Sequence, residues 1–573
     1  MKKFLASIIA VVLAVSGLSV ISITANAATI FISGNYEYTV NSDDTVNIAG
    51  YKGIATDITI PSQILNKNVV KISDNSFYNN STLTSVKIPN TIKVVGSMAF
   101  HNCTKLSKVT LPSNLTEIGY NAFEGTTALT TITIPKTVTT AGNNVFNGSA
   151  LKTATIENGA TAVADNLFSN AKNLTKVTIP NTVKKVGSMS FYGCKSLSSV
   201  TLPNTLTEIG YSAFNGTTAL TTITIPKTVT KAGIDVFEDS GLKTATIENG
   251  ATTVADNLFS NAKNLTKVTI PNTVKKVGSM SFYHCEKLSS VTLPNTLTEI
   301  DYSAFNGTTA LTTITIPKTV TKAGNDVFED SGLKTATIEN GATAVADNLF
   351  SNAKNLTKVT IPNTVKKVGS MSFYHCEKLS SVTLPNTLTE IGYSAFEGTT
   401  ALTTITIPKT VTTAGNNVFN GSALKTAAIE KGTTTVADNL FSNAKNLTKV
   451  TIPNTVKKVG SMSFYGCKSL SSVTLPNTLT EIGYSAFNGT TALTTITIPK
   501  TVTKAGNDVF EDSGLKTATI ENGATAVADN LFSNAKNLTK VTIPNTVKKV
   551  GSMSFYHCEK LSSVTLPNTL TEI

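Results

Sequence analysis

Cysteine and histidine are the residue types of this sequence that could bind a metal or take part in catalysis. The cysteines recur every 91 residues, at Cys103, Cys194, Cys285, Cys376, Cys467 and Cys558. His284, His375 and His557 directly precede a cysteine, and His101 lies two residues before one. A His-Cys pair could supply two metal ligands, or a nucleophile and its base, but further ligands would have to come from a pair at least 91 residues away. We therefore predict no metal, no cofactor, no catalytic residue and no enzyme, and interpret the histidines as solvated loop residues.

The spacing of the cysteines reflects an internal repeat. From Leu197 onward, four related segments of 23, 22, 23 and 23 residues follow one another, and the set of four recurs every 91 residues. The segment NTVKKVGSMSFYHCEKLSSVTLPNTLTEI is identical at 272–300, 363–391 and 545–573. Counted from Leu83 there are 22 units, the last one incomplete, and we expect the natural chain to continue past Ile573.

Each unit has the apolar pattern of one turn of a solenoid. In the unit that begins at Leu197, Val200 and Leu202 alternate as in a strand that stops at Pro203, a second short extended piece follows, and a turn carries Phe214. One unit buries too little to fold alone, whereas stacked units share a core. The predicted fold is a β-rich solenoid, a leucine-rich-repeat rod or shallow horseshoe with one parallel strand per 22-23-residue coil and short turns or single helical turns on the other side.

This fold decides the expected state of the cysteines. Parallel strands lie about 4.8 Å apart, so cysteines that are four coils apart would be separated by about 19 Å, which is too far for a disulfide. We therefore expect all six cysteines to be reduced residues of the core.

The residues before the repeat have other signatures. Lys2 and Lys3, the apolar stretch 4–23 and the small-residue site Ala25-Asn26-Ala27 predict a secretory signal peptide over residues 1–27. Residues 28–82 predict an N-terminal hairpin and a capping coil, and residues 83–573 the leucine-rich-repeat solenoid. No later stretch is long and apolar enough to span a membrane, so we expect a secreted, extracellular or cell-surface protein.

Hydroxyl groups and lysines form the candidate binding surface. Thr occupies the fifth position in 20 of the 22 units, and the third position adds Thr, Ser or Lys, with both positions pointing away from the core. Thr also suits an exposed strand through its β-propensity alone, so a purely structural explanation stays open. The ligand face predicted from one set of four units comprises Lys176, Thr178, Ser199, Thr201, Thr222, Thr224, Thr244 and Thr246.

Charge narrows the class of partner. All 48 basic residues are lysines, against 36 acidic residues, and the lysines cluster once per set. Such a cluster favours either a solvated face or attraction to anionic wall polymers or acidic glycans. The absence of arginine argues against bidentate recognition of phosphates, and we expect no nucleic acid among the partners.

The unit L-x-x-V-x-L-P-x-x-L-x-x-I-G-x-x-A-F-x-x-C resembles the BspA-like bacterial leucine-rich-repeat family of secreted and surface proteins, over about residues 58–573. The sequence departs from the general leucine-rich repeat because no Asn ladder follows the strand, and units such as that of Glu157-Asn158-Gly159 have Glu in place of Pro. The resemblance implies binding or adhesion rather than catalysis. We predict a non-catalytic binding or adhesion protein that presents an extended repeat face to host or matrix protein or glycan. The alternative is a structural spacer or stalk for a module beyond the C-terminus.

Overall fold

The computed structural model describes residues 29–573, which fall into two compact units, 1–154 and 155–573. The signal peptide expected over residues 1–27 lies outside the described residues and stays a prediction. Between residues 29 and 573 all regular structure is β-strand, and no helix is long and apolar enough to cross a membrane.

The N-terminal unit starts with an antiparallel meander of β1, β2 and β3 and continues as a parallel ladder through β6, β8, β10 and β12. β5 pairs with β6, and β4, β7 and β9 form a second parallel sheet. The strands of this unit are β1 (Phe31–Ser33), β2 (Tyr36–Val40), β3 (Val46–Tyr51), β4 (Asp57–Thr59), β5 (Gln63–Ile64), β6 (Lys67–Ile72), β7 (Ser85–Lys87), β8 (Val94–Val95), β9 (Lys108–Thr110), β10 (Glu117–Ile118), β11 (Thr131–Ile134) and β12 (Thr140–Ala141), and β13 (Thr153–Ile156) runs across the boundary at residue 154.

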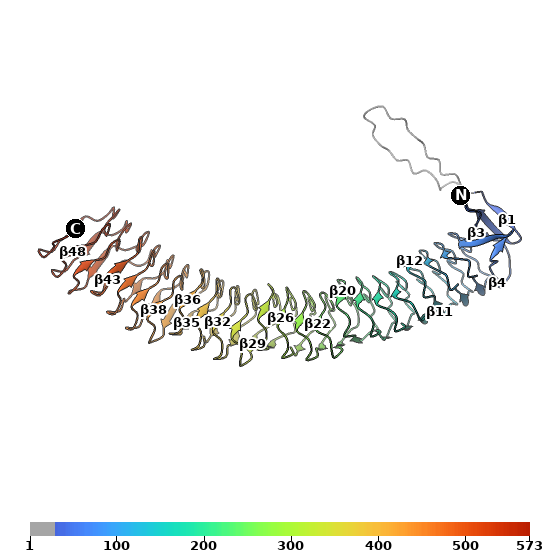
Figure 1. The fold of residues 1–573 in the computed structure, drawn as a ribbon, viewed down its shortest axis with the longest axis horizontal. Helices are drawn as coiled ribbons and strands as arrows, with labels where there is room; N and C mark the ends of the chain where they lie inside the picture. The colour runs from blue at the N-terminus through green and yellow to red at the C-terminus, as the bar shows by residue number, and fades with distance from the viewer. Residues whose placement is uncertain (1–28) are drawn as a thin grey trace, which may run out of the picture. The chain divides into compact units, whose positions relative to one another are not determined.

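The second unit is a stack of coils that follow one another side by side (Figure 1). We name the four coil types of one set A, B, C and D, which begin at Leu197, Leu220, Leu242 and Leu265. Each complete coil contributes one strand to a first parallel ladder and one to a second. The predicted parallel solenoid of 22–23-residue coils is confirmed, and the second extended piece of each coil also forms a strand.

The first-ladder strands of the second unit are β15 (Lys176–Thr178), β17 (Ser199–Val200), β19 (Thr222–Ile225), β21 (Thr244–Ile247), β23 (Lys267–Thr269), β25 (Ser290–Val291), β27 (Thr313–Ile316), β29 (Thr335–Ile338), β31 (Lys358–Thr360), β33 (Ser381–Val382), β35 (Thr404–Ile407), β37 (Thr426–Ile429), β39 (Lys449–Thr451), β41 (Ser472–Val473), β43 (Thr495–Ile498), β45 (Thr517–Ile520), β47 (Lys540–Thr542) and β49 (Ser563–Val564).

The second-ladder strands of this unit are β14 (Ala162–Val163), β16 (Lys185–Val186), β18 (Glu208–Ile209), β20 (Lys231–Ala232), β22 (Thr253–Val254), β24 (Lys276–Val277), β26 (Glu299–Ile300), β28 (Lys322–Ala323), β30 (Ala344–Val345), β32 (Lys367–Val368), β34 (Glu390–Ile391), β36 (Thr413–Ala414), β38 (Thr435–Val436), β40 (Lys458–Val459), β42 (Glu481–Ile482), β44 (Lys504–Ala505), β46 (Ala526–Val527) and β48 (Lys549–Val550).

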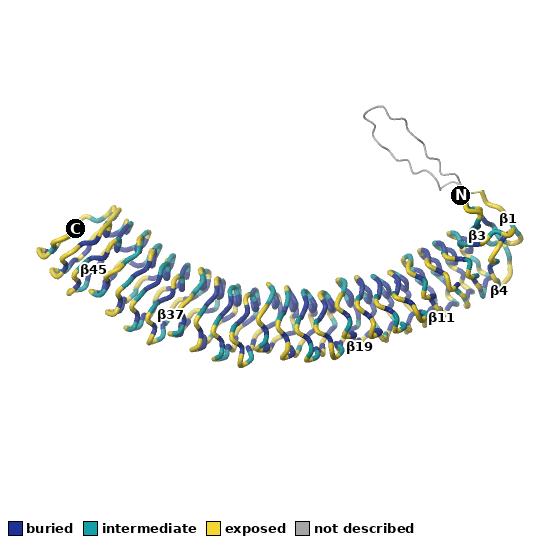
Figure 2. Tube along the Cα trace, viewed as in Figure 1, coloured by how far each residue is buried: buried dark blue, intermediate teal, exposed yellow. Residues whose placement is uncertain are grey.

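A column of phenylalanines forms the centre of the core. Phe282, Phe305 and Phe328 are fully buried, and their ring centroids lie 5.0 and 5.4 Å apart in consecutive coils. Figure 2 shows buried residues recurring in every coil of the second unit between exposed ones. Offset stacking at this spacing adds to the hydrophobic gain of burying each ring.

The segment that carries each phenylalanine forms consecutive turns rather than a helical turn. In one coil Ala304 N donates to Asp301 O at 3.3 Å, and Asn306 N donates to Ser303 O at 3.2 Å. Ser303 has φ 50°, and equivalent residues along the stack are left-handed as well. Left-handed residues of this kind cannot continue a right-handed helix, so the segment turns without forming one.

Candidate ligand-binding face

The eight residues predicted as a ligand face are all exposed and come from four consecutive coils. Lys176 lies opposite Ser199, Thr222 opposite Thr244, and Thr224 opposite Thr246 in the parallel register. Lys176 and Thr178 belong to β15, Ser199 to β17, Thr222 and Thr224 to β19, and Thr244 and Thr246 to β21, while Thr201 directly follows β17.

The number of residue pairs between neighbouring first-ladder strands falls from joint to joint within each set, and the last joint has none. Four residue pairs join coil B to coil C, three join C to D, and two join D to the next A, as seen from β19 to β25. Within the described residues of the second unit, the strand of coil A and that of the following coil B belong to separate sheets. The ladder is thus interrupted once per set, between coils A and B.

The residue after the strand accounts for the longest pairing. In coil C this residue is Glu248, whose backbone N–H donates to Ile225 O at 2.9 Å. Coils A, B and D have Pro203, Pro226 and Pro271 at this position. Proline has no N–H to donate, so pairing ends earlier at those coils.

A shallow groove lies at each interruption of the first ladder in the second unit. The grooves have volumes of about 460 to about 570 Å³, and equivalent residues line all four. We call them groove I (residues 199–248), groove II (290–339), groove III (381–451) and groove IV (472–521). Six of the eight predicted residues line groove I: Ser199, Thr201, Thr222, Thr224, Thr244 and Thr246.

Further groove residues were not anticipated from the sequence. Groove I is also lined by Asn204, Pro226 and Glu248. Glu248 Oε2 accepts a hydrogen bond from Lys227 N at 3.1 Å, which fixes the carboxylate at the end of the groove. The signals available in the sequence were the 22-residue length of coil B and the replacement of Pro by Glu in coil C.

Lysines alternate with the grooves along the same face. Lys267 lies opposite Ser290 at one side of groove II, and Lys358 lies opposite Thr335 at its other side. The same relation brackets the other grooves, and each of these lysines is exposed. We call them the face lysines: Lys176, Lys267, Lys358, Lys449 and Lys540.

The second ladder differs because its coil D lysines meet carboxylates of the following coil A. Lys185 Nζ lies 3.1 Å from Glu208 Oε1, and the equivalent pairs Lys367–Glu390 and Lys458–Glu481 are 3.0 and 2.9 Å long. In one set, Lys276 of coil D also contacts Asp301 of the following coil A at 2.6 Å, and that hydrogen bond raises the lysine pKa. Among the described residues, none of the face lysines has an ion-pair partner within 4.0 Å.

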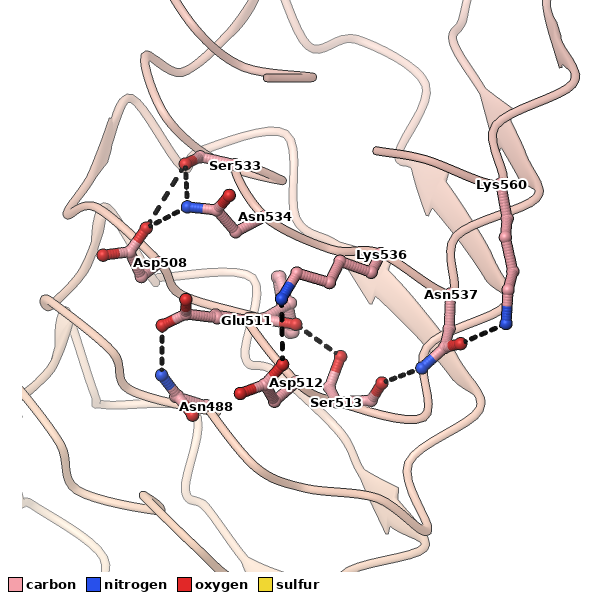
Figure 3. Close-up of polar contacts among 11 residues, drawn as sticks. Asn488, Asp508, Glu511, Asp512, Ser513, Ser533, Asn534, Lys536, Asn537 and Lys560 are labelled. Carbon is pink, nitrogen blue, oxygen red and sulfur yellow. Dashed lines mark hydrogen bonds and ion pairs between the residues drawn. The ribbon is translucent and has the colours of Figure 1, made fainter. Parts of the chain in front are cut away.

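An acidic loop in coil B is the other polar concentration, and it is held by neighbouring coils (Figure 3). Asp508 accepts from Asn534 Nδ2 at 2.8 Å, Glu511 accepts from Asn488 Nδ2 at 2.7 Å, and Asp512 lies 3.6 Å from Lys536. In the equivalent loop, burial and the nearby carboxylates of Asp235 and Asp239 raise the pKa of Glu238. These contacts join coils A, B and C, which gives the loop a structural role.

The cysteines and histidines lie in the turns. All six cysteines are free, as expected, and all are buried except half-buried Cys558. The Cys285 thiol donates to Phe259 O at 3.1 Å, and burial raises its pKa. The His284 ring contacts that of Tyr283 at 4.3 Å between centroids. No group of three or more His, Cys, Asp or Glu side chains in residues 29–573 is arranged to hold a metal ion.

Two solved structures illustrate what the chain is similar to. A leucine-rich repeat protein from Bacteroides ovatus shares 23% identity over 82% of this chain and 94% of its own, with a TM-score of 0.34. A leucine rich cell surface protein from Faecalibacterium prausnitzii shares 24% identity over 75% of this chain and 96% of its own, with a TM-score of 0.32. No curated protein matches the chain.

The sequence itself matches a family model over most of its length. The BspA type leucine rich repeat region matches residues 55–175, 161–288, 233–357, 343–471 and 457–573. These segments overlap and together extend over the coils that carry both ladders, the phenylalanine column and the four grooves. The chain therefore belongs to the BspA-type leucine-rich-repeat family.

Proposed function

We propose that this chain is a non-catalytic binding protein of the bacterial cell surface, and that the first-ladder face of its coils contacts host or matrix protein or glycan. The observation that carries the proposal is the recurrence of one groove, built from equivalent residues, in four consecutive sets. Repeat proteins use such extended faces for recognition. Family membership and the predicted signal peptide support a position outside the cell.

The chemistry of the grooves supports binding rather than catalysis. The polar groups that line groove I are hydroxyls, one amide and one carboxylate, and its apolar lining is Val200, Leu202, Ile223 and Pro226. A single carboxylate without a second acid, base or nucleophile beside it gives no pair for general acid-base work. The grooves are of the size at which small ligands or segments of larger ones are held.

The test replaces one exposed threonine in each groove. In the full chain, Thr222→Glu, Thr313→Glu, Thr404→Glu and Thr495→Glu together place a new charge and a larger side chain in all four grooves. We expect binding to immobilised matrix proteins, mucin or cell-wall polymers to fall by about tenfold or more, measured by biolayer interferometry. Far-ultraviolet circular dichroism should be unchanged, because these side chains are exposed.

The matched control uses the same substitution in the same coils. Thr230→Glu, Thr321→Glu, Thr412→Glu and Thr503→Glu change exposed threonines next to the second ladder. We expect this variant to keep its binding within about twofold, since it adds the same net charge elsewhere. Equal losses in both variants would contradict a dedicated face, and an absence of binding by the unmodified chain would favour the spacer function.

A further inference from the structure

The face lysines and the grooves form one alternating series. Each groove in the second unit has a lysine strand on both sides, so five lysines bracket four grooves. Consecutive face lysines are four coils apart, or about 19 Å at the spacing of parallel strands. The face therefore repeats a positive charge and a hydroxyl-lined groove at a constant interval.

In residues 29–573 the face lysines form no ion pair, since no carboxylate lies within 4.0 Å of any of them. The third and fifth positions of each coil in the second unit, counted from its first residue, form this face. They hold Ser, Thr, Lys or Ala and never a carboxylate. The acids that line the grooves are glutamates, such as Glu339, whose Oε2 accepts a hydrogen bond from Lys318 N at 3.0 Å. In the second ladder, in contrast, coil D lysines such as Lys185, Lys367 and Lys458 lie about 3 Å from glutamates.

The groove surface is suited to a hydrated, polyhydroxylated ligand. Ser290, Thr313 and Thr335 supply hydroxyls to groove II, and Asn295 supplies an amide. The interruption between β25 and β27 also leaves strand edges at the groove floor that do not pair with each other. None of the residues that line this groove is aromatic, so it offers no large apolar anchor of the kind that dominates protein interfaces.

We propose that the ligand of this face is a linear polysaccharide with carboxylates at regular intervals, lying along the direction in which the coils stack. Its sugar hydroxyls exchange hydrogen bonds with the grooves, and its carboxylates pair with the face lysines. This assignment rests on the proposed function and names its ligand class. Each lysine-carboxylate contact is weak at an exposed site, so affinity comes from several contacts made by one chain.

The experiment measures binding of the full chain to hyaluronan, a linear polysaccharide with one carboxylate per disaccharide. Uncharged dextran and polyglutamate serve as comparisons. We expect hyaluronan to bind, long chains to bind at least about tenfold more tightly than oligosaccharides shorter than one lysine interval, and binding to weaken from low salt to about 0.15 M. Equal affinity for short and long chains would overturn the proposal, as would equal binding of polyglutamate or dextran.

Two five-lysine variants separate this face from charge in general. The first changes every face lysine to Gln: Lys176, Lys267, Lys358, Lys449 and Lys540. The second changes five exposed lysines beside the second ladder to Gln: Lys184, Lys275, Lys366, Lys457 and Lys548. Both lose five charges, but only the first should lower hyaluronan binding by about tenfold or more.

Equal loss in the two variants would overturn the proposal, because the attraction would then be unspecific. The outcome for the proposed function is read separately. If matrix proteins bind through the threonines of the grooves while hyaluronan does not bind, the ligand class is wrong and the proposed function stands. If neither binds, both are wrong.

Discussion

At the scale of single residues, one column of turn positions shows how neighbouring coils constrain each other. Gly307 and Gly216 are equivalent residues one set apart, with φ of 72° and 70°. A Cβ on Gly307 would lie 2.8 Å from the His284 ring, whereas a Cβ on Gly216 would meet only Gly193, at 3.5 Å. The residue in the preceding coil therefore decides how much room the glycine has.

This difference predicts unequal effects of the same substitution. Gly216→Ala should destabilise its coil by about 1–2 kcal/mol, the cost of a left-handed alanine. Gly307→Ala should cost about 1 kcal/mol more, because the His284 ring must also move. Hydrogen exchange of the affected coils and the denaturant midpoint measure both. In the double variant with His284→Gly, the extra cost should disappear, and equal effects of the two single substitutions would refute the explanation.

At the scale of elements, the coil could be predicted from the sequence but the interruptions of its ladders could not. Leu197, Val200, Leu202 and Phe214 recur at fixed positions, and that spacing is enough to predict one coil and its core. Val200 and Ile223 occupy the same position in coils A and B, yet their strands are in separate sheets. Pairing depends on the relative position of two coils, which the apolar pattern within one coil does not contain.

The candidate site, too, could be predicted only in part from the sequence. The exposed Thr and Lys positions could be predicted, because alternation along a strand determines which side chains point outward. The grooves could not, because they arise where coils A and B separate. The second ladder is interrupted at a different joint, between B and C, where the ring planes of Phe237 and Phe259 differ by 24°, against 10° for Phe214 and Phe237. Coil B is the 22-residue unit, so its shorter turn accompanies this rotation.

The two interruptions predict a pattern of hydrogen exchange. Averaged over the sets, first-ladder amides should exchange fastest at the A–B joint, and second-ladder amides fastest at the B–C joint, because inter-strand hydrogen bonds are missing there. Mass spectrometry of proteolytic peptides is sufficient, since equivalent peptides from different sets report the same joint. Uniform protection of all joints would show that the interruptions close in solution.

At the scale of the whole molecule, the length of the second unit reflects the number of copies of one set of four coils. Each set of four coils adds one core segment, one groove and one face lysine, and nothing in the second unit requires a particular number of sets. In a stack of this kind, stability is close to a sum of coil and interface terms between neighbours. The number of sets then changes the number of binding positions more than it changes the fold.

Deleting one complete set tests this modularity. Removal of residues 272–362 joins Pro271 to Asn363 and restores the original sequence, since 272–300 and 363–391 are identical. The product should fold with a melting temperature within about 3 °C of the parent, because every coil keeps its neighbours. It should retain three grooves and bind long ligands less tightly, as calorimetric titration would measure.

A second, shorter deletion removes only residues 272–294. It brings the first-ladder strand of a D coil beside that of a B coil and removes the A–B joint. That chain should stay folded and keep all five face lysines but lose groove II, so it should bind less tightly than the parent although it lacks only 23 residues, against 91 in the first deletion. A loss of binding that scales with the number of residues removed would mean that the grooves are not the units of recognition.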